Sequence, residues 1–384
     1  MPEHIFIISP RRFQKRDIKR FGVEYLKKKK RVTMLDVSNL INNRSSLFYK
    51  KIRNINIKEI KSYKELIDFF KNKEFSYAID YSGYSIKEII IKFLLVWFDI
   101  KIIRYLGGLK PPILYKHVDQ NNEIFKVDQR TALKKLFDIP YVIFTFLKKK
   151  IITLINFFSI NIVMITGKNL QNVDYYINTA KKKLYSHTYD YNTYLELNKK
   201  KTLKKKKYIV YIDQNLSSHP DFYINKKNPF VNKNFYKKID RFLLELKKKY
   251  KLNIKIALHP KNNLNKNFFL NKKNCHIFKT VKLIKDSEHI LMHYSTAVSF
   301  GVLYKKPITF ITSDELNNVR PGAQITKLAK ELSSQLINID SYKKNFIMRK
   351  SFDKKKYINY KNQYIKHPKS SGENSWKYLL KNIY

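Results

Sequence analysis

Short runs of consecutive apolar residues alternate along this chain with longer stretches in which apolar residues recur at helical spacing. Three of the runs are His4–Ser9 (HIFIIS), Tyr77–Asp80 (YAID) and Tyr208–Ile212 (YIVYI). Strands that are apolar throughout are typical of parallel sheets, which helices cover on both faces. The alternation therefore predicts an α/β chain with parallel sheets.

The same pattern places further elements in both halves of the chain. We expect strands at Val32–Val37, Ile102–Leu106, Ile160–Thr166, Ile254–Leu258, His276–Phe278, Ile290–Met292 and Ile308–Ile311. We expect helices at Asp17–Lys30, Ile86–Phe98, Asn234–Tyr250, Ala297–Leu303, Ile325–Leu336 and Ser375–Tyr384. Each half repeats strand and helix, which predicts two similar α/β units.

A run of charges at 198–207 (NKKKTLKKKK) offers almost nothing that a core could bury, and the strand–helix pattern restarts after it. We place the domain boundary there, which gives domains at residues 1–200 and 201–365. Residues 366–384 are predicted to contain a helix that packs back on the first domain. A length of 384 residues suits two domains.

Lysine dominates the charge of the chain. The 79 Lys and Arg residues outnumber the 30 Asp and Glu residues, which gives a net charge of +49, but only 12 of the basic residues are Arg. Arginine is the residue that most often forms paired hydrogen bonds with guanine bases and with phosphate groups. The lysines, moreover, are spread through every segment of the chain. Nucleic acid is therefore not the partner we expect. A basic face against anionic lipid fits the composition better.

The sequence predicts no membrane-spanning helix, because the longest stretch without a charged residue, Ile151–Gly167, has 17 residues and polar interruptions. Aromatic residues around the basic run Lys148–Lys150, within 131–158, suit either a helix in a membrane interface or ordinary core helices. The single cysteine, Cys275, excludes a disulfide scaffold and fits a reducing compartment. We expect a cytoplasmic protein, with peripheral contact at the inner face of the cytoplasmic membrane as an open alternative.

Polar side chains follow several strands of the second domain, where open α/β sheets bind ligands. The strand that stops at Leu258 is followed by His259, Pro260 and Lys261. Pro260 favours extended geometry at His259, so we expect the imidazole to point into a cleft and donate to a phosphate oxygen, with Lys261 adding charge. The alternative is a strand end without a functional role, at which His259 donates its hydrogen bond to a backbone carbonyl.

A second strand end carries His293, followed by Ser295 and Thr296 at the start of a predicted helix. Ser and Thr are common helix caps, and the first turn of a helix also offers N–H groups to an anion. We expect these three residues to bind the donor together with His259, with helix capping alone as the alternative.

Three aspartates at strand ends are candidates for the general base that activates an acceptor hydroxyl. Asp213 follows the first strand of the second domain, whereas Asp36 and Asp80 belong to the first domain. The sequence does not choose among them, and for Asp213 a turn that closes the strand is the alternative. The chain has no H-E-x-x-H, Walker A or D-x-D pattern, so we expect catalysis without a metal or cofactor.

The order of these motifs resembles the bacterial surface-polysaccharide transferases of capsule and lipopolysaccharide assembly. The similar features are His259-Pro260 after a strand, Ser295-Thr296 opening a helix and Lys306-Pro307 before another strand, within roughly residues 205–312. The group includes polysialyltransferases, capsule Kdo transferases and CDP-glycerol glycerophosphotransferases. The resemblance implies a GT-B-like fold, with two Rossmann-like domains whose parallel sheets face a central cleft, and donor-binding roles for His259, Ser295 and Thr296.

The resemblance also implies a function. It predicts a glycosyltransferase that moves a sugar from a nucleotide-activated donor, a CMP-linked acidic sugar in particular, to a bacterial surface glycan or a lipid-linked glycan. Residues 1–200 would then hold the acceptor and residues 201–365 the donor. The acidic motif that supplies the base in polysialyltransferases has no clear match in the first domain. Two alternatives stay open: a CDP-glycerol-type polyol-phosphate transferase, and a non-catalytic basic module that binds nucleic acid or anionic lipid.

Overall fold

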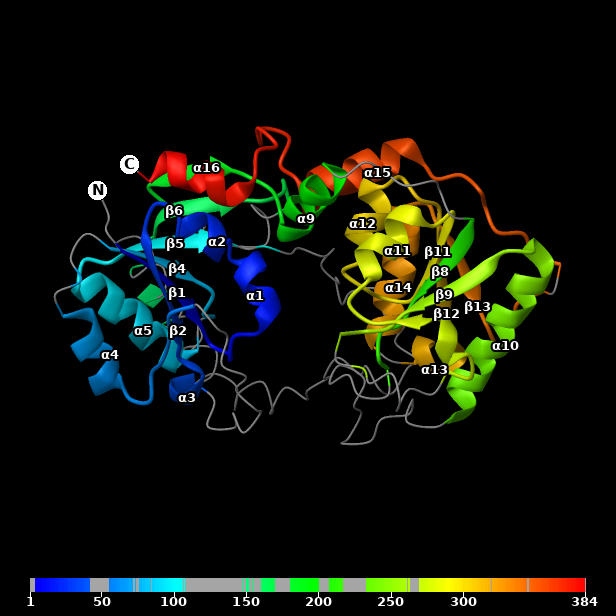
Figure 1. Ribbon diagram of the computed structural model, residues 1–384, viewed down its shortest axis with the longest axis horizontal. Helices are drawn as coiled ribbons and strands as arrows, with labels where there is room; N and C mark the ends of the chain where they lie inside the picture. Colours follow the sequence, from blue (N-terminus) through cyan, green and yellow to red (C-terminus); the bar gives the residue numbers. More distant parts are fainter. Residues whose placement is uncertain are drawn as a thin grey trace, which may run out of the picture. The chain divides into compact units, whose positions relative to one another are not determined.

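The chain forms two compact units, each built around one parallel sheet (Figure 1). The computed structural model describes residues 4–41, 55–71, 73, 76–83, 85–105, 107, 147, 150, 151, 154, 160–169, 180–199, 207–216, 233–260, 262, 269–318, 320–343 and 345–383. The first unit takes its described residues from 4–107, 147–192 and 363–383, and the second takes them from 193–362.

The sheet of the first unit has the strand order β3-β2-β1-β4-β5-β6-β7, and every strand pair is parallel. Its strands are β1 His4–Ser9, β2 Arg31–Asp36, β3 Ile57–Glu59, β4 Tyr77–Asp80, β5 Lys101–Tyr105, β6 Ile160–Ile165 and β7 Lys182–Tyr185. Ile8 of β1 lies between Leu35 of β2 and Asp80 of β4. The strand order reverses between β1 and β4, as in a Rossmann-like sheet.

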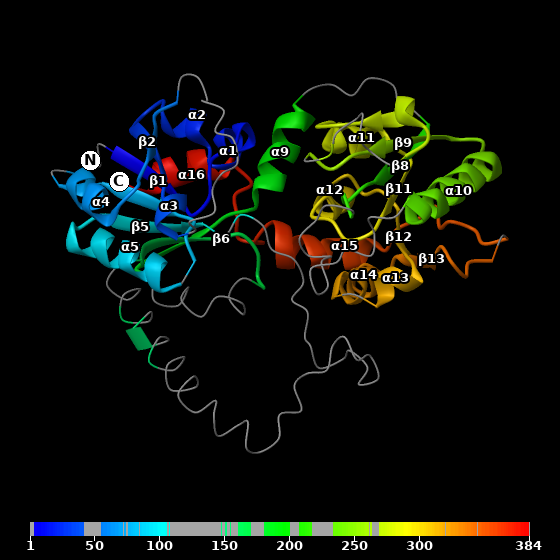
Figure 2. The same ribbon diagram turned by 90° about the horizontal axis from the view of Figure 1, so that it is seen from below.

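Helices cover both faces of this sheet. The described helices of this unit are α1 Lys15–Arg20, α2 Val23–Leu26, α3 Ser38–Ile41, α4 Tyr63–Phe70, α5 Ile86–Trp97 and α16 Ser375–Asn382. Helix α9, Tyr189–Asn198, begins in the first unit and ends in the second. Successive residues of a strand point to opposite faces. Ile5 and Ile7 pack in one core with residues of α2 and α16, while Phe6 and Ile8 pack in another with residues of α4 and α5. In both views α4 and α5 lie side by side (Figures 1 and 2).

The second unit repeats this architecture with six strands in the order β10-β9-β8-β11-β12-β13, again all parallel. Its strands are β8 Tyr208–Ile212, β9 Asn253–Ala257, β10 Cys275–His276, β11 His289–Met292, β12 Ile308–Thr312 and β13 Gln335–Asn338. Its helices are α10 Lys233–Tyr250, α11 Thr280–Asp286, α12 Val298–Leu303, α13 Asp314–Asn317, α14 Arg320–Glu331 and α15 Lys354–Tyr360, with a 3-10 turn at Lys272–Asn274. A π-helical segment, Lys361–Ile365, follows α15 and contains the boundary between the two units. The expected pair of Rossmann-like domains with parallel sheets is confirmed.

The last helix of the chain completes the first unit. Trp376 is fully buried there and packs over Gly22, which separates α1 from α2. Gly22 has φ +61°, and a Cβ atom at this position would lie 2.0 Å from Cγ of Trp376. Both the left-handed backbone and the indole therefore require glycine. The single helix that the sequence predicted over Asp17–Lys30 is wrong for this reason, since the chain turns at Gly22.

Other differences from the predicted elements concern the edges of the two sheets. The helix expected over Ile325–Leu336 ends at Glu331, and Gln335–Asn338 forms the edge strand β13 beside β12. The edge strands β3 and β7 were not predicted, because each is short and carries charged residues. Among the described helices, none has both the length and the apolar character needed to cross a membrane.

Candidate functional site

The carboxyl ends of three neighbouring strands in the second unit define the candidate site. β8 lies between β9 and β11, and the strand order reverses between β8 and β11. Ligands of open α/β sheets bind at the carboxyl ends of strands beside such a reversal. The described residues that follow these strands are 213–216 after β8, 258–260 after β9 and 293–297 after β11. We call this region the β8–β9–β11 edge.

Asp213 is the buried carboxylate of this edge, with 3% of its surface exposed. Nδ2 of Asn262 donates a hydrogen bond to Oδ2 of Asp213 at 3.1 Å, and the backbone N–H groups of Asn215 and His259 also favour the charged form. Burial is the larger influence and raises the pKa of Asp213 to about 6. The groups of the described residues that hydrogen-bond this carboxylate are an amide and backbone N–H groups, and because burial outweighs them the pKa of Asp213 stays raised.

The turn after β9 brings its polar groups against Asp213. His259 is half-buried and Pro260 is exposed. The backbone N–H of Asn262 donates to the carbonyl of His259 at 2.8 Å, and this turn directs the Asn262 amide toward Asp213. The turn that begins at His259 therefore lies against Asp213 at this sheet edge, and each residue follows the strand that the sequence predicted before it. Lys261, the third residue of the predicted donor-binding run, lies outside the described residues.

The end of β11 is tied to the end of β8 by a side chain. Oε1 of Gln214 accepts a hydrogen bond from the backbone N–H of Tyr294 at 2.7 Å. The next two residues, Ser295 and Thr296, are half-buried and exposed, respectively, and Oγ of Ser295 accepts from the backbone N–H of Ala297 at 3.2 Å. Ser295 therefore caps the turn that leads into α12, while both hydroxyls remain at the same edge as Asp213.

His293 is fully buried, and both of its ring nitrogens are engaged within the protein. Its Nδ1 lies 2.7 Å from the carbonyl of Ile311, which can only accept, so Nδ1 carries the proton and Nε2 accepts from the hydroxyl of Tyr211 at 2.7 Å. Burial lowers the pKa of His293 to about 4, so the ring is neutral. The side chain joins β8, β11 and β12, and this leaves no ring nitrogen for the donor contact that the sequence predicted.

Asp80, one of the three predicted bases, is a buried counter-ion in the first unit. Its Oδ2 lies 2.9 Å from Nζ of Lys92 and 3.5 Å from a guanidinium nitrogen of Arg104, and all three side chains are buried. Burial alone would raise the pKa of Asp80, but the two cations hold it below its ordinary value. Arg104 also donates to the carbonyls of Asp80 and Ser82. This carboxylate is therefore occupied in joining β4 to Lys92 of α5 and Arg104 of β5.

Asp36, the other predicted base of the first unit, is the last residue of β2, where it pairs with Ser9 of β1, and it is fully buried. Its Oδ1 accepts a hydrogen bond from the backbone N–H of Ser38 at 3.0 Å, which starts α3. Its Oδ2 has no hydrogen-bond partner among the described residues. Within the part of the chain that the structure describes, one oxygen of Asp36 is unsatisfied and no cation pairs with it, so Asp36 stays a candidate for the acceptor side.

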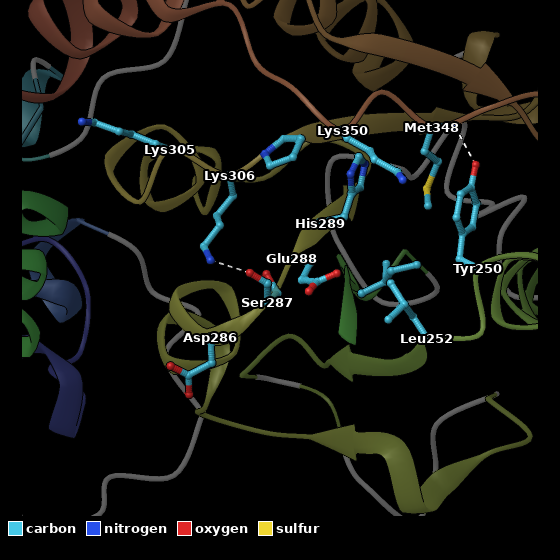
Figure 3. Close-up of a pocket in the computed structure, with 12 residues that line it drawn as sticks. Tyr250, Leu252, Asp286, Ser287, Glu288, His289, Lys305, Lys306, Met348 and Lys350 are labelled. Carbon is cyan, nitrogen blue, oxygen red and sulfur yellow. Dashed lines mark hydrogen bonds between the residues drawn. The ribbon is translucent and has the colours of Figure 1, made fainter. Parts of the chain in front are cut away.

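A cavity of about 410 Å³ lies at the opposite edge of the second sheet (Figure 3). Its lining comes from the amino ends of β8, β9, β11 and β12 and includes Glu288, His289, Lys306 and Lys350. Lys306 donates to the backbone carbonyl of Ser287, as the close-up shows. Because ligands of such sheets bind at the carboxyl ends of the strands, this cavity is not the site built around Asp213.

The sequence did not indicate two side chains of the β8–β9–β11 edge. These are Asn262, whose amide contacts Asp213, and Gln214, whose amide oxygen binds the backbone of Tyr294. Asn262 stands three residues after His259, which is the spacing of a hydrogen-bonded turn. That spacing could have predicted the turn, but it does not show that the Asn262 side chain points toward Asp213. The contact with Asp213 joins residues 49 positions apart, and only the folded sheet brings them together.

Comparisons with known proteins identify the fold. No protein-family model and no curated protein matches the chain. The solved structure of UDP-GlcNAc 2-epimerase from Methanocaldococcus jannaschii is similar, with 12% identity, a TM-score of 0.50, and coverage of 99% of this chain and 98% of that one. A His-to-Ala variant of the wall teichoic acid polymerase TagF is similar with 14% identity and a TM-score of 0.51, covering 100% of this chain and 88% of that one. At these identities the likeness concerns the fold, and it confirms the GT-B-like fold that the sequence implied.

Proposed function

We propose that this chain is a glycosyltransferase that moves a sugar from a nucleotide-activated donor to a bacterial surface glycan or a lipid-linked glycan. The observation that carries the proposal is Asp213, a buried carboxylate with a pKa of about 6 beside the His259-Pro260 turn, at the strand reversal of a GT-B-like unit. A general base is most effective when its pKa lies near the working pH, and transfer to a hydroxyl requires such a base.

The donor is held, in this proposal, by the groups that end β9 and β11. The imidazole of His259 and the hydroxyls of Ser295 and Thr296 donate to phosphate oxygens, and Pro260 shapes the turn. Lys261 adds positive charge that stabilises the leaving phosphate. Support comes from their common position beside the strand reversal, where phosphate-containing ligands of α/β sheets bind.

Asp213 acts as the base in this proposal. It accepts the proton of the acceptor hydroxyl while the acceptor oxygen forms a bond to the anomeric carbon of the sugar. The bond from that carbon to the donor phosphate breaks, and the nucleotide leaves with the bonding electron pair. Asp36, with its unsatisfied buried oxygen, is the second candidate for this role, and Asp80 is the third and least favoured, because two cations hold its carboxylate.

The donor we propose is a CMP-linked acidic sugar, and a CDP-glycerol-type polyol-phosphate transferase is the second candidate. The second candidate is favoured by the structural similarity to a wall teichoic acid polymerase. UDP-GlcNAc is a necessary third ligand in any test, because an epimerase of that sugar nucleotide is also similar. The same fold supports several chemistries, so fold alone does not choose among them.

A ligand screen by thermal stabilisation separates these candidates, because a ligand that binds the folded state raises the melting temperature by mass action. We expect CMP to stabilise the protein more than UDP. Stabilisation by CDP-glycerol beyond that by CMP would favour the polyol-phosphate transferase. Steeply salt-dependent binding to polyanions without any response to nucleotides would favour the non-catalytic basic module.

The substitution His259→Ala tests the site directly. We expect it to abolish transfer with the donor identified in the screen while the melting temperature stays close to that of the wild type. His276→Ala is the matched control, since His276 is a partly exposed histidine of the outermost strand of the same sheet. Full transfer activity in His259→Ala would contradict the assignment. Activity in excess EDTA tests the expectation of metal-independent transfer, which stays a prediction.

A further inference from the structure

Helix α5 of the first unit exposes a continuous apolar stripe. Ile86, Ile90, Phe93 and Trp97 are 58%, 38%, 50% and 73% exposed, respectively. Their spacing of four, three and four residues places them on one side of a helix. The rings of Phe93 and Trp97 lie 6.0 Å apart, so the stripe ends in a pair of neighbouring aromatic side chains. The helix lies beside α4 on one face of the sheet (Figure 2).

The opposite side of α5 fixes this orientation. Ile91 and Leu95 are fully buried in the core of the first unit. Glu88 accepts the backbone N–H groups of Gly83 and Ser85, and Lys92 pairs with Asp80. The helix cannot rotate to bury its stripe without breaking these contacts. The helix therefore buries one apolar side together with two charged side chains, and it exposes a second apolar side, which an ordinary surface helix does not.

A second apolar stripe occurs in the same unit. Leu147, Ile151 and Leu154 are helical and are 53%, 51% and 61% exposed, with spacings of four and three residues. Lys150 is also exposed. This repeats the pattern of α5, where Lys87 is exposed next to the stripe. Each stripe thus combines large apolar side chains with a neighbouring lysine.

We propose that these two stripes dock the first unit on an anionic lipid bilayer. Charge selects this occupant over a second copy of the chain, because two molecules of net charge +49 repel each other whereas an anionic surface attracts them. Apolar residues ending in a Trp, with lysine at the border, are the combination that lies in the plane of a membrane interface. The inference does not depend on the reaction proposed for the second unit.

Vesicle sedimentation tests this docking. We expect the protein to sediment with vesicles of phosphatidylcholine that contain about one quarter phosphatidylglycerol, and to bind pure phosphatidylcholine more weakly. The double variant Phe93→Glu/Trp97→Glu should bind the anionic vesicles at least about tenfold more weakly. Leu270→Glu/Phe278→Glu is the matched control, because it adds the same two charges at residues of the second unit that are each 77% exposed. Equal binding by the wild type and the double variant would overturn the proposal.

The tryptophans provide a second measurement on the unmodified protein. The chain has two, of which Trp97 is 73% exposed and Trp376 is fully buried. Anionic vesicles whose acyl chains carry bromine should quench the fluorescence of Trp97, and Trp97→Phe should remove most of the quenching. Emission that brominated vesicles leave unchanged under sedimenting conditions would also overturn the proposal.

Self-association is the outcome that would replace the proposal. Sedimentation equilibrium without lipid should show a monomer for the wild type and for Phe93→Glu/Trp97→Glu. A wild-type dimer that the double substitution dissociates, together with vesicle binding that it does not change, would assign the stripe to a second copy of this chain and overturn the lipid assignment.

Discussion

Two buried aspartates at strand ends, one in each unit, have opposite electrostatic surroundings. Asp80 in the first unit lies between Lys92 and Arg104, which hold its pKa below the ordinary value despite burial. Asp213 in the second unit is surrounded by amide and backbone N–H groups, and burial raises its pKa to about 6. Equal burial therefore produces a structural anion in one case and a titratable group in the other.

A strand-end position therefore does not by itself indicate a base. Burial penalises the charge of both carboxylates, and the neighbouring cations decide whether the penalty is offset. A carboxylate that two cations hold has little tendency to accept a proton at neutral pH. A buried carboxylate that accepts hydrogen bonds but pairs with no cation can exchange a proton near its raised pKa.

The largest expected effect is on transfer by Asp213→Asn. If Asp213 is the base, its loss should reduce kcat by about 10²- to 10⁴-fold, because that is the typical contribution of a positioned acid or base. The measurement is sugar transfer with the donor that the thermal screen identifies. Asp36→Asn is the matched control from the first unit. A larger loss in Asp36→Asn than in Asp213→Asn would move the base to the first unit.

A large loss of stability is expected from Asp80→Asn. The substitution leaves Lys92 and Arg104 charged and buried without their partner, which should lower the free energy of unfolding of the first unit by about 3–5 kcal/mol. Urea unfolding measures the change. Because the folded-state pKa of Asp80 is lowered, its stabilising contribution is present above about pH 4 and is lost as the pH falls.

A double-mutant cycle checks the cause of that loss. Adding Lys92→Met to Asp80→Asn removes one of the two unpaired charges, so the double variant should be more stable than the sum of the single effects predicts. Purely additive effects would show that Lys92 and Asp80 do not interact in solution.

The opposite change in stability is expected from Asp213→Asn. A folded-state pKa of about 6 against 3.8 for the ordinary carboxyl means that folding disfavours the charged form. Removing the charge should therefore stabilise the second unit by up to about 3 kcal/mol above pH 6. The gain should shrink between pH 6 and pH 4 and vanish below the ordinary pKa, which urea unfolding across this range measures. A loss of stability at pH 7 would contradict the raised pKa.

The smallest expected effect is on the pH dependence of transfer. The rate should fall as the pH decreases through about 6, because protonated Asp213 cannot accept a proton. Asn262→Ala removes a hydrogen bond that favours the charged form, so the midpoint should move upward by about half to one pH unit. His276→Ala serves again as the control, and a profile without an inflection near pH 6 would contradict the role of Asp213.

The sequence predicted the interior strands well, because residues such as Ile5–Ile8 and Tyr208–Ile212 are buried on both faces and leave an uninterrupted apolar run. It failed where that rule does not apply. Lys182–Tyr185 is an edge strand with two lysines, and the apolar residues of β13 continued the pattern of the preceding helix. The break at Gly22 depends on Trp376, which is more than 350 positions away and leaves no local signal beyond the glycine itself.

The position of the candidate site could be predicted from the sequence, but the roles of its individual residues could not. Its strand ends were predicted, since His259, Asp213 and Ser295 each follow an apolar run. The distinction between Asp213 and Asp80 depends on Lys92 and Arg104, which lie in the next helix and the next strand. The burial of His293 between Tyr211 and Ile311 likewise follows from sheet pairing, which joins residues far apart in the chain.

The packing of Trp376 on Gly22 has a consequence for biosynthesis. Translation delivers residues 363–383 after the second unit, whose described residues all lie between positions 193 and 362. The second unit can therefore fold while the first still lacks Trp376 and Leu379 from its core. In most multidomain chains the amino-terminal domain folds first. Here the core around the first strands of the chain is complete only after the last helix of the chain has been synthesised.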